Sequence, residues 1–168
     1  MELLAVADIR GEQVIEHQVI LPGRGRRRRA RFPEVLPINL HHTAIAVPDL
    51  DETLATLLRL FAVEPLTREV IVDQGVEEAM IPLGGSYLQL LTPLGPETPV
   101  GRFLERRGPG LHHIAIQVTD LDAALAHLAA AGAELIDRES RIGGAGHRIA
   151  FVHPRALGGT LIELVEVH

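Results

Sequence analysis

The sequence predicts an α+β domain formed by two similar modules, and an internal repeat is the main reason. The segment LHHTAIAVPDLD at 40–51 aligns without gaps on LHHIAIQVTDLD at 111–122, with nine of twelve positions identical. Each copy has the pattern of a strand, a helix cap and a helix, followed by short strand-like segments. A module of about 50 residues buries too little surface to be stable alone, so the two should pair, with curved sheets inside and helices outside.

The first module is predicted at 39–94. Asp49 can cap its helix, because a side-chain oxygen at that position accepts a free backbone N–H of the first turn. Gly84-Gly85 separates two strand-like segments and suits a two-residue hairpin turn. The strands are predicted at 41–47, 76–83 and 86–92.

A linker helix at 97–108 and a second module at 110–167 follow. Pro99 falls in the first turn of the linker helix, where proline is tolerated. Asp120 can cap the second module's helix, and Gly132 suits its end. The last two strands are predicted at 148–152 and 160–167.

The composition excludes several kinds of chemistry. The chain has 168 residues, a formal net charge of −6 and no cysteine, and all 16 basic residues are arginine. Thiol nucleophiles, disulfides, Schiff-base lysines and the lysine of a P-loop are therefore excluded. No apolar run reaches the roughly 18–20 residues of a membrane span, and the acidic start does not resemble a signal peptide. We expect a cytoplasmic protein without a membrane partner.

Residues 1–37 form a predicted N-terminal extension that precedes the domain at 38–168. Its segment 24–31 holds six arginines. Such a run can be an arm for nucleic acid, or a flexible extension or misassigned translation start. We favour the second reading and expect no nucleic-acid partner, because only 3% of the residues are aromatic and nothing else in the chain suggests one.

One histidine of each repeated pair is predicted to face a cleft. Side chains alternate along a strand, so His42 shares a face with two alanines while His41 lies on the opposite face with branched residues. In the second copy His113 takes the place of His42, and His112 that of His41. The branched face should pack against a helix, so His42 and His113 should point into the concavity, where small alanines leave room.

Gln89 and Glu163 complete a set of four polar side chains. Each lies inside an apolar run at an equivalent place in its module, and a buried polar group needs a partner. Two imidazoles, one amide oxygen and one carboxylate suit a divalent cation such as Co, Mn, Ni, Zn or Fe, with two octahedral positions left for a substrate. Beside them, strand geometry requires either Glu77 or Glu78 to face inward, and it does not decide between the two.

The motifs HHTAIAVPDLD, DQGVEEAMIPLG, LQLLTPL, GPGLHHIAIQV, GGAGHRIAFVHP and GGTLIELVE resemble those of one known family. They occur in the family's order over about three quarters of the chain. The family is that of the methylmalonyl-CoA epimerases, within the vicinal-oxygen-chelate (VOC) superfamily of glyoxalases and bleomycin-resistance proteins. The resemblance implies paired βαβββ modules in a curved, mixed sheet that encloses a cleft around one metal ion.

The resemblance also implies an activity and a site. It assigns the metal ligands to His42, Gln89, His113 and Glu163, and the acid/base groups to Glu78, rather than Glu77, and to Glu163. The implied reaction interconverts (R)- and (S)-methylmalonyl-CoA by removal and return of the α-proton through a metal-stabilised enediolate. An acyl-CoA substrate and a homodimer are further expectations.

Three other functions compete with this hypothesis. A glyoxalase I-like isomerase would use the same kind of metal site for proton transfer. A ring-cleaving dioxygenase would use His42, His113 and Glu163 as an iron triad. Gln89 as a fourth ligand argues against the dioxygenase because it closes a position that oxygen needs. A metal-free binding or resistance protein would have apolar residues in place of the histidines.

The chain has no lysine, so any side-chain cation that binds the phosphates of CoA must be an arginine. The sequence does not rank the candidates Arg102, Arg106, Arg107 and Arg148.

Overall fold

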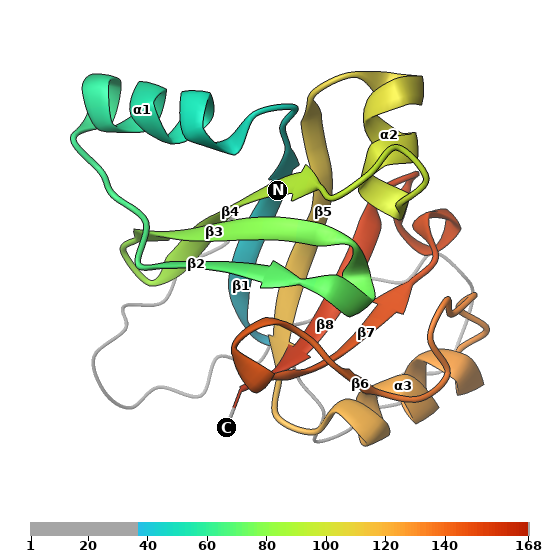
Figure 1. The fold of residues 1–168 in the computed structure, drawn as a ribbon. Coiled ribbons are helices and arrows are strands. Elements are labelled where there is room, and N and C mark those ends of the chain that lie inside the picture. The colour runs from blue at the N-terminus through green and yellow to red at the C-terminus, as the bar shows by residue number, and fades with distance from the viewer. Residues whose placement is uncertain (1–36, 168) are drawn as a thin grey trace, which may run out of the picture. The chain divides into compact units, whose positions relative to one another are not determined.

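The computed structural model describes residues 37–167. Residues 1–36, with the arginine-rich segment, and His168 lie outside the described residues. The described part contains one sheet of eight strands and three α-helices (Figure 1). None of these helices combines the length and hydropathy that crossing a membrane requires.

Each module has the order βαβββ, as the family resemblance implies. The first module contains β1 (Pro37–Ala46), α1 (Leu50–Phe61), β2 (Thr67–Ile71), β3 (Val76–Leu83) and β4 (Ser86–Pro93). The second contains β5 (Gly110–Val118), α3 (Leu121–Ala130), β6 (Arg141–Ile142), β7 (Arg148–Val152) and β8 (Leu161–Glu166). The linker helix α2 (Pro99–Arg107) connects them.

Side-chain caps start all three helices, and those of α1 and α3 are the predicted ones. The Asp49 carboxylate accepts a hydrogen bond from the Glu52 N–H at 2.8 Å, and Asp120 accepts one from the Ala123 N–H at 2.9 Å. Thr98 caps the linker helix through the Gly101 N–H, just before Pro99. The repeated sequence therefore produces the same strand-to-helix turn twice, which fixes the start of α1 and α3.

The sheet order is β2-β3-β4-β1-β5-β8-β7-β6, so the two modules meet where β1 and β5 pair antiparallel. Within each module the first strand pairs in parallel with the last, β1 with β4 and β5 with β8. Figure 1 shows β1 and β5 side by side in the middle of the sheet, with the other strands curling away to either side and the helices outside. This arrangement gives the sheet a near-twofold relation about the β1–β5 pair.

Each helix covers a separate part of the apolar core. Leu50, Leu54 and Leu57 of α1 pack on Ala79, Ile81 and Leu90 of the first module. The equivalent cluster joins α3 to β7 and β8 in the second module. The linker helix packs through Val100 against the first module, on the side of Ala44 and Ala46. The inner face of the sheet, left free by α1 and α3, carries the buried polar residues.

Three register shifts interrupt the β1–β5 pair, one near its start, between Pro37 and Asn39, and two at the histidine pairs. Leu40 pairs with Ile116 and His42 with Ala115, so His41 is an extra residue on β1. Ala44 pairs with His113 and Ile45 with Leu111, so His112 is an extra residue on β5. Such a bulge locally breaks the period of two and redirects the side chain of the extra residue. The first histidine of each pair is therefore freed from the alternation that its strand would impose.

Candidate metal centre and catalytic site

Both modules line one cavity of about 560 Å³ on the concave side of the sheet. Five polar side chains in its wall are buried, with at most 7% of their surface exposed: His42, Glu78, Gln89, His113 and Glu163. These are the five residues singled out from the sequence. The fold thus brings all of the predicted site residues into one cavity.

Strand register explains how four of these side chains converge. Directly paired residues on neighbouring strands point to the same face of a sheet. One row across three strands reads Gln89, Ala44 and His113, and a second reads His42, Ala115 and Glu163. In each row a fully buried alanine separates two polar residues, so their longer side chains can lean toward each other over a methyl group.

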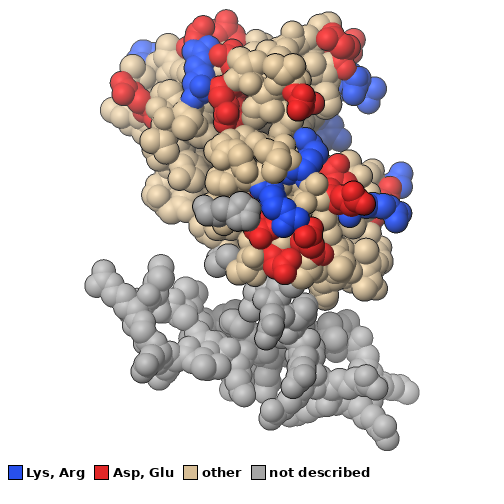
Figure 2. All heavy atoms as spheres, turned by 60° about the horizontal axis from the view of Figure 1, so that its bottom comes forward, with Lys and Arg blue, Asp and Glu red and all other residues tan. Residues whose placement is uncertain are grey.

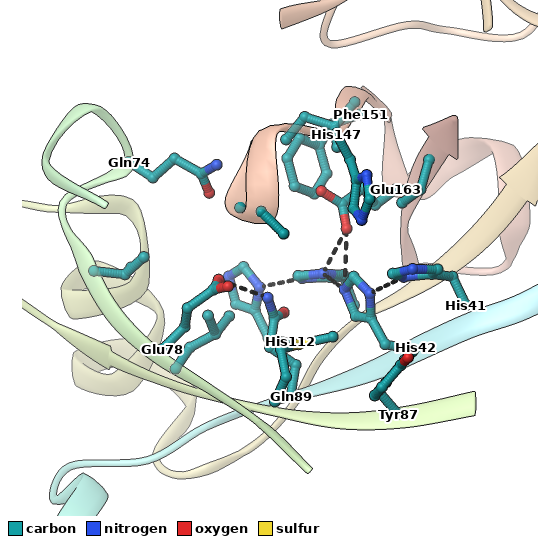
Figure 3. A pocket seen from close by; sticks show the side chains of 18 of the residues that line it. His41, His42, Gln74, Glu78, Tyr87, Gln89, His112, His147, Phe151 and Glu163 are labelled. Carbon is teal, nitrogen blue, oxygen red and sulfur yellow. Dashed lines mark hydrogen bonds and ion pairs between the residues drawn. The ribbon is translucent and has the colours of Figure 1, made fainter. Parts of the chain in front are cut away.

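Three nitrogen and oxygen atoms lie close enough to share one cation. His42 Nε2 is 3.0 Å from His113 Nε2, and Glu163 Oε2 is 3.0 and 3.3 Å from these two nitrogens (Figure 3). Ligands that bind one first-row ion at about 2.1 Å lie about 3.0 Å apart at neighbouring octahedral positions. The spacing of the three atoms matches that of a metal centre.

Two buried oxygens have no hydrogen-bond partner among the described residues. They are Glu163 Oε2 and the amide oxygen Gln89 Oε1. A buried acceptor without a donor is costly, so both atoms call for a ligand that the protein itself does not supply. Although burial alone would raise the pKa of Glu163, the imidazoles of His113 and His42 lower it to about 2. An anionic carboxylate, two imidazoles and an amide oxygen fit a divalent cation.

Glu78 lies beside this centre with different properties. Its Oε2 accepts a hydrogen bond of 2.7 Å from Gln89 Nε2. Burial, with the charges of Glu69 and Glu163, raises the pKa of Glu78 to about 7. Glu77 faces the other side of β3, where its carboxylate binds Arg68 Nε at 2.7 Å. Only Glu78 of the two adjacent glutamates lines the cavity.

Residues 41–151 match the family described as the Glyoxalase/Bleomycin resistance protein/Dioxygenase superfamily. The mitochondrial methylmalonyl-CoA epimerase of Homo sapiens is 34% identical over 126 residues, which are 74% of this chain and 72% of the human protein. The chain belongs to the methylmalonyl-CoA epimerase family.

Two further similarities support membership of this epimerase family. The ethylmalonyl-CoA/methylmalonyl-CoA epimerase of Cereibacter sphaeroides is 38% identical over 130 residues, covering 76% of this chain and 97% of the relative. A methylmalonyl-CoA epimerase solved in complex with methylmalonyl-CoA and NH4+ has 39% identity and a TM-score of 0.73, over 76% of this chain and 92% of the other. These similarities confirm the paired βαβββ fold of the family.

This member of the epimerase family places a second histidine behind each ligand histidine. His41 Nδ1 is 2.8 Å from His42 Nδ1, and His112 Nδ1 is 2.9 Å from His113 Nδ1 (Figure 3). Burial lowers the pKa of both His41 and His112 to about 4, so both are neutral near pH 7. A neutral imidazole can accept at Nδ1, and this would leave each ligand histidine its Nε2 lone pair for a cation.

The prediction that His41 and His112 lie on the opposite face was therefore wrong. Both line the cavity, because each is the extra residue of a bulge and escapes the alternation of its strand. The repetition of a double histidine was the signal that could have identified them. His147, in the loop before β7, also lines the cavity, with its ring 5.9 Å from that of His41.

A glycine-rich loop from the second module closes over Glu78. The Ala145 N–H donates to Glu69 Oε1 at 3.1 Å, which ties this loop to β2 of the first module. Glu69 pairs directly with Glu78 across β2 and β3, so the two carboxylates share a face. A Cβ atom at Gly144 would lie only 2.6 Å from Glu78 Oε1. The sequence did not indicate Glu69 or Gly144, since their contacts depend on the join between modules.

Proposed function

We propose that the chain is a divalent-metal-dependent epimerase that interconverts (R)- and (S)-methylmalonyl-CoA by proton transfer. Membership of the epimerase family supports this proposal, as does the cavity's pairing of a metal-ligand set with a separate buried carboxyl group. The observation on which it rests most is the buried carboxyl group of Glu78, which accepts a hydrogen bond of 2.7 Å from Gln89 of the proposed ligand set. A cation held by His42, Gln89, His113 and Glu163 would supply Lewis-acid stabilisation of the negative charge that forms on the substrate.

Two carboxyl groups with opposite pKa shifts can move the proton. The low pKa of Glu163 makes it a carboxylate near neutral pH, while the pKa of about 7 lets Glu78 hold or release a proton there. Glu163 Oε2 faces the imidazoles, which leaves Oε1 for a proton. Epimerisation needs one proton taken from one face of the α-carbon and one returned to the other face, with no redox change.

The two glutamates come from different modules, Glu78 from β3 and Glu163 from β8. For one enantiomer Glu163 takes the α-proton and the Glu78 carboxyl returns one. The other enantiomer needs the state that the first direction leaves, with Glu78 as the carboxylate and the abstracted proton on Glu163 Oε1. Glu78 then takes the α-proton and Glu163 returns its own. The burial of both groups limits proton exchange with water during the reaction.

The first test is exchange of the α-proton. We expect the metal-loaded protein to incorporate deuterium at the α-carbon of methylmalonyl-CoA in D₂O, measured by mass spectrometry against a metal-stripped control. Glu78→Gln should lower the rate by at least about 100-fold, because one acid/base group is lost, while bound metal is retained. Glu77→Gln is the matched control and should keep the rate. Equal losses in the two variants, or no incorporation by the parent protein, would contradict the proposal.

We also infer a bound ion from among cobalt, manganese, nickel, zinc and iron, because imidazole and oxygen ligands suit them all. Metal analysis of the purified protein, followed by exchange rates with each ion restored to stripped protein, tests this inference. A cytoplasmic homodimer remains a further expectation, which fractionation of cells and sedimentation velocity would check.

A further inference from the structure

A second, smaller cavity of about 330 Å³ lies against the linker helix α2. It shares Pro99, His112 and Leu161 with the wall of the catalytic cavity, so the two spaces are adjacent. We call it the α2 groove. Its lining consists of Pro99, Arg102, Phe103, Arg106, Arg107, His112, Pro154, Gly159 and Leu161.

The α2 groove and the catalytic cavity carry opposite charge. Three arginines and no carboxylate line the groove. The catalytic cavity has a single arginine, Arg141, against five acidic side chains: Glu69, Asp73, Glu78, Asp137 and Glu163. A ligand with several phosphates would be repelled by that acidic wall and attracted to the groove.

The groove arginines are also free of ion pairs, which distinguishes them from others in the described residues. Arg148 binds both Glu166 at 2.8 Å and Asp122 at 2.7 Å, so its charge is already compensated. The same holds for Arg68, Arg141 and Arg155, each of which pairs with a carboxylate. Figure 2 shows such neighbouring blue and red side chains on one face of the described residues. Of the four arginine candidates from the sequence, only the three on α2 have no carboxylate partner among the described residues, and the Arg102 guanidinium also donates to the backbone carbonyl of Glu97.

A line of side chains with edge-to-face ring contacts connects the groove to the candidate metal centre. The Arg107 guanidinium lies 5.9 Å from the centre of the Phe103 ring, and that ring lies 4.9 Å from the His112 ring. His112 in turn contacts the ligand histidine His113. A ligand bound at the metal centre could therefore extend past His112 into the groove.

We propose that Arg102, Arg106 and Arg107 form a subsite in the α2 groove for the phosphate groups of the substrate's CoA moiety. This inference rests on the proposed function, which supplies a substrate with a long phosphorylated carrier. Arginine suits the role because its planar guanidinium can donate two parallel hydrogen bonds to one phosphate.

The test compares two substrates that share the acyl-pantetheine part and differ in the phosphorylated adenosine of CoA. Methylmalonyl-CoA carries them, and methylmalonyl-pantetheine does not. In the double variant Arg106→Ala/Arg107→Ala, the ratio of kcat/KM for the CoA thioester to kcat/KM for the pantetheine thioester should fall about tenfold, through KM. Arg59→Ala, which removes an exposed arginine on α1, is the control and should leave the ratio unchanged.

The outcomes separate this proposal from the proposed function. An unchanged ratio in the double variant, with the parent protein active on both substrates, would overturn the subsite alone. No epimerisation of either substrate by the parent protein would overturn the proposed function. Calorimetry with adenosine 3′,5′-bisphosphate then tests the groove directly: binding should weaken about tenfold in the double variant. Equal binding by both proteins, or competition by inorganic phosphate alone at equal concentration, would show that the groove does not select the CoA carrier.

Discussion

Glu78 combines deep burial with two acidic neighbours, and this has a consequence for stability. Its pKa is about 7 in the folded chain against an ordinary value of 4.5, so the folded state holds the proton more tightly than the unfolded one does. The stabilising contribution of the neutral carboxyl is complete below about pH 4.5 and is lost as the pH rises through 7. At alkaline pH the chain must fold around an unfavourable buried charge.

We therefore expect Glu78→Gln to stabilise the metal-free protein at pH 8.5 but not at pH 5. The gain in free energy of unfolding at pH 8.5 should be on the order of 2–3 kcal/mol, since the amide needs no ionisation. Urea unfolding at the two pH values measures it. Glu77→Gln changes a half-buried carboxylate that pairs with Arg68 outside the cavity, and it should show no comparable trend. A difference that is independent of pH would contradict the assigned pKa.

His41 is the second residue whose role can be tested separately. If its ring orients His42, His41→Ala should weaken metal binding by about 10- to 100-fold, the usual effect of removing a hydrogen-bond partner behind a ligand. Competition with a chromophoric chelator gives the dissociation constant without reference to activity. His127→Ala, in an exposed helical position, is the control. Identical affinities for His41→Ala and the parent protein would assign His41 to packing only.

At the scale of elements, the strands and caps were largely predictable from sequence and the bulges were not. Asp49 and Asp120 cap their helices as predicted, and the hairpin strands at 76–83 and 86–93 match closely. These features depend on neighbouring residues. The bulges at His41 and His112 depend on pairing between strands about 70 residues apart, and no local pattern marks them. The expected helix end at Gly132 is also slightly late, since α3 ends at Ala130.

The glycine-rich loop gives a prediction for one element. In Gly144→Ala the new methyl group would push the Glu78 carboxylate aside, because it would meet Oε1 at 2.6 Å. We expect the exchange rate to fall by about 100-fold, the scale of effect that a misplacement of about 1 Å produces. Thermal unfolding should change little because the side chain can move. Gly85→Ala, where a Cβ meets nothing within 4 Å, is the control. Normal exchange by Gly144→Ala would show that the loop does not constrain Glu78.

At the scale of the whole molecule, the sequence repeat was enough to predict the pairing of the modules and the four buried polar side chains that meet in one cavity. Gln89 and Glu163 could be matched because they occupy equivalent places in the repeat, and the register now shows each of them two strands away from a histidine of the set. The choice between Glu77 and Glu78 needed the family resemblance first, and the ion pair of Glu77 with Arg68 explains it physically. The contact of Glu69 with the second module could not be predicted from the sequence pattern, because it joins residues 76 positions apart in the chain.

Because each module supplies two of the four proposed ligands, a bound ion should hold the modules together. Adding Co²⁺ at 100 times its dissociation constant should stabilise the stripped protein by about 2.7 kcal/mol. For a domain of this size that corresponds to roughly 10 °C in Tm, measurable by calorimetry. Glu163→Gln should reduce the shift strongly because it removes the anionic ligand. An unchanged Tm of the parent protein after addition of Co²⁺ or any of the other candidate ions would contradict the proposed metal centre.

The near-twofold relation about β1 and β5 also bears on how such a chain could have arisen. Two copies of one ancestral module, joined through their first strands, would surround a cation with two histidines and two identical polar side chains. In the present chain those two side chains have diverged into an amide at position 89 and a carboxylate at position 163. That difference, together with Glu78, whose place in the second module is taken by Ile149, makes the two halves of the cavity unequal, so a substrate's two faces meet different groups.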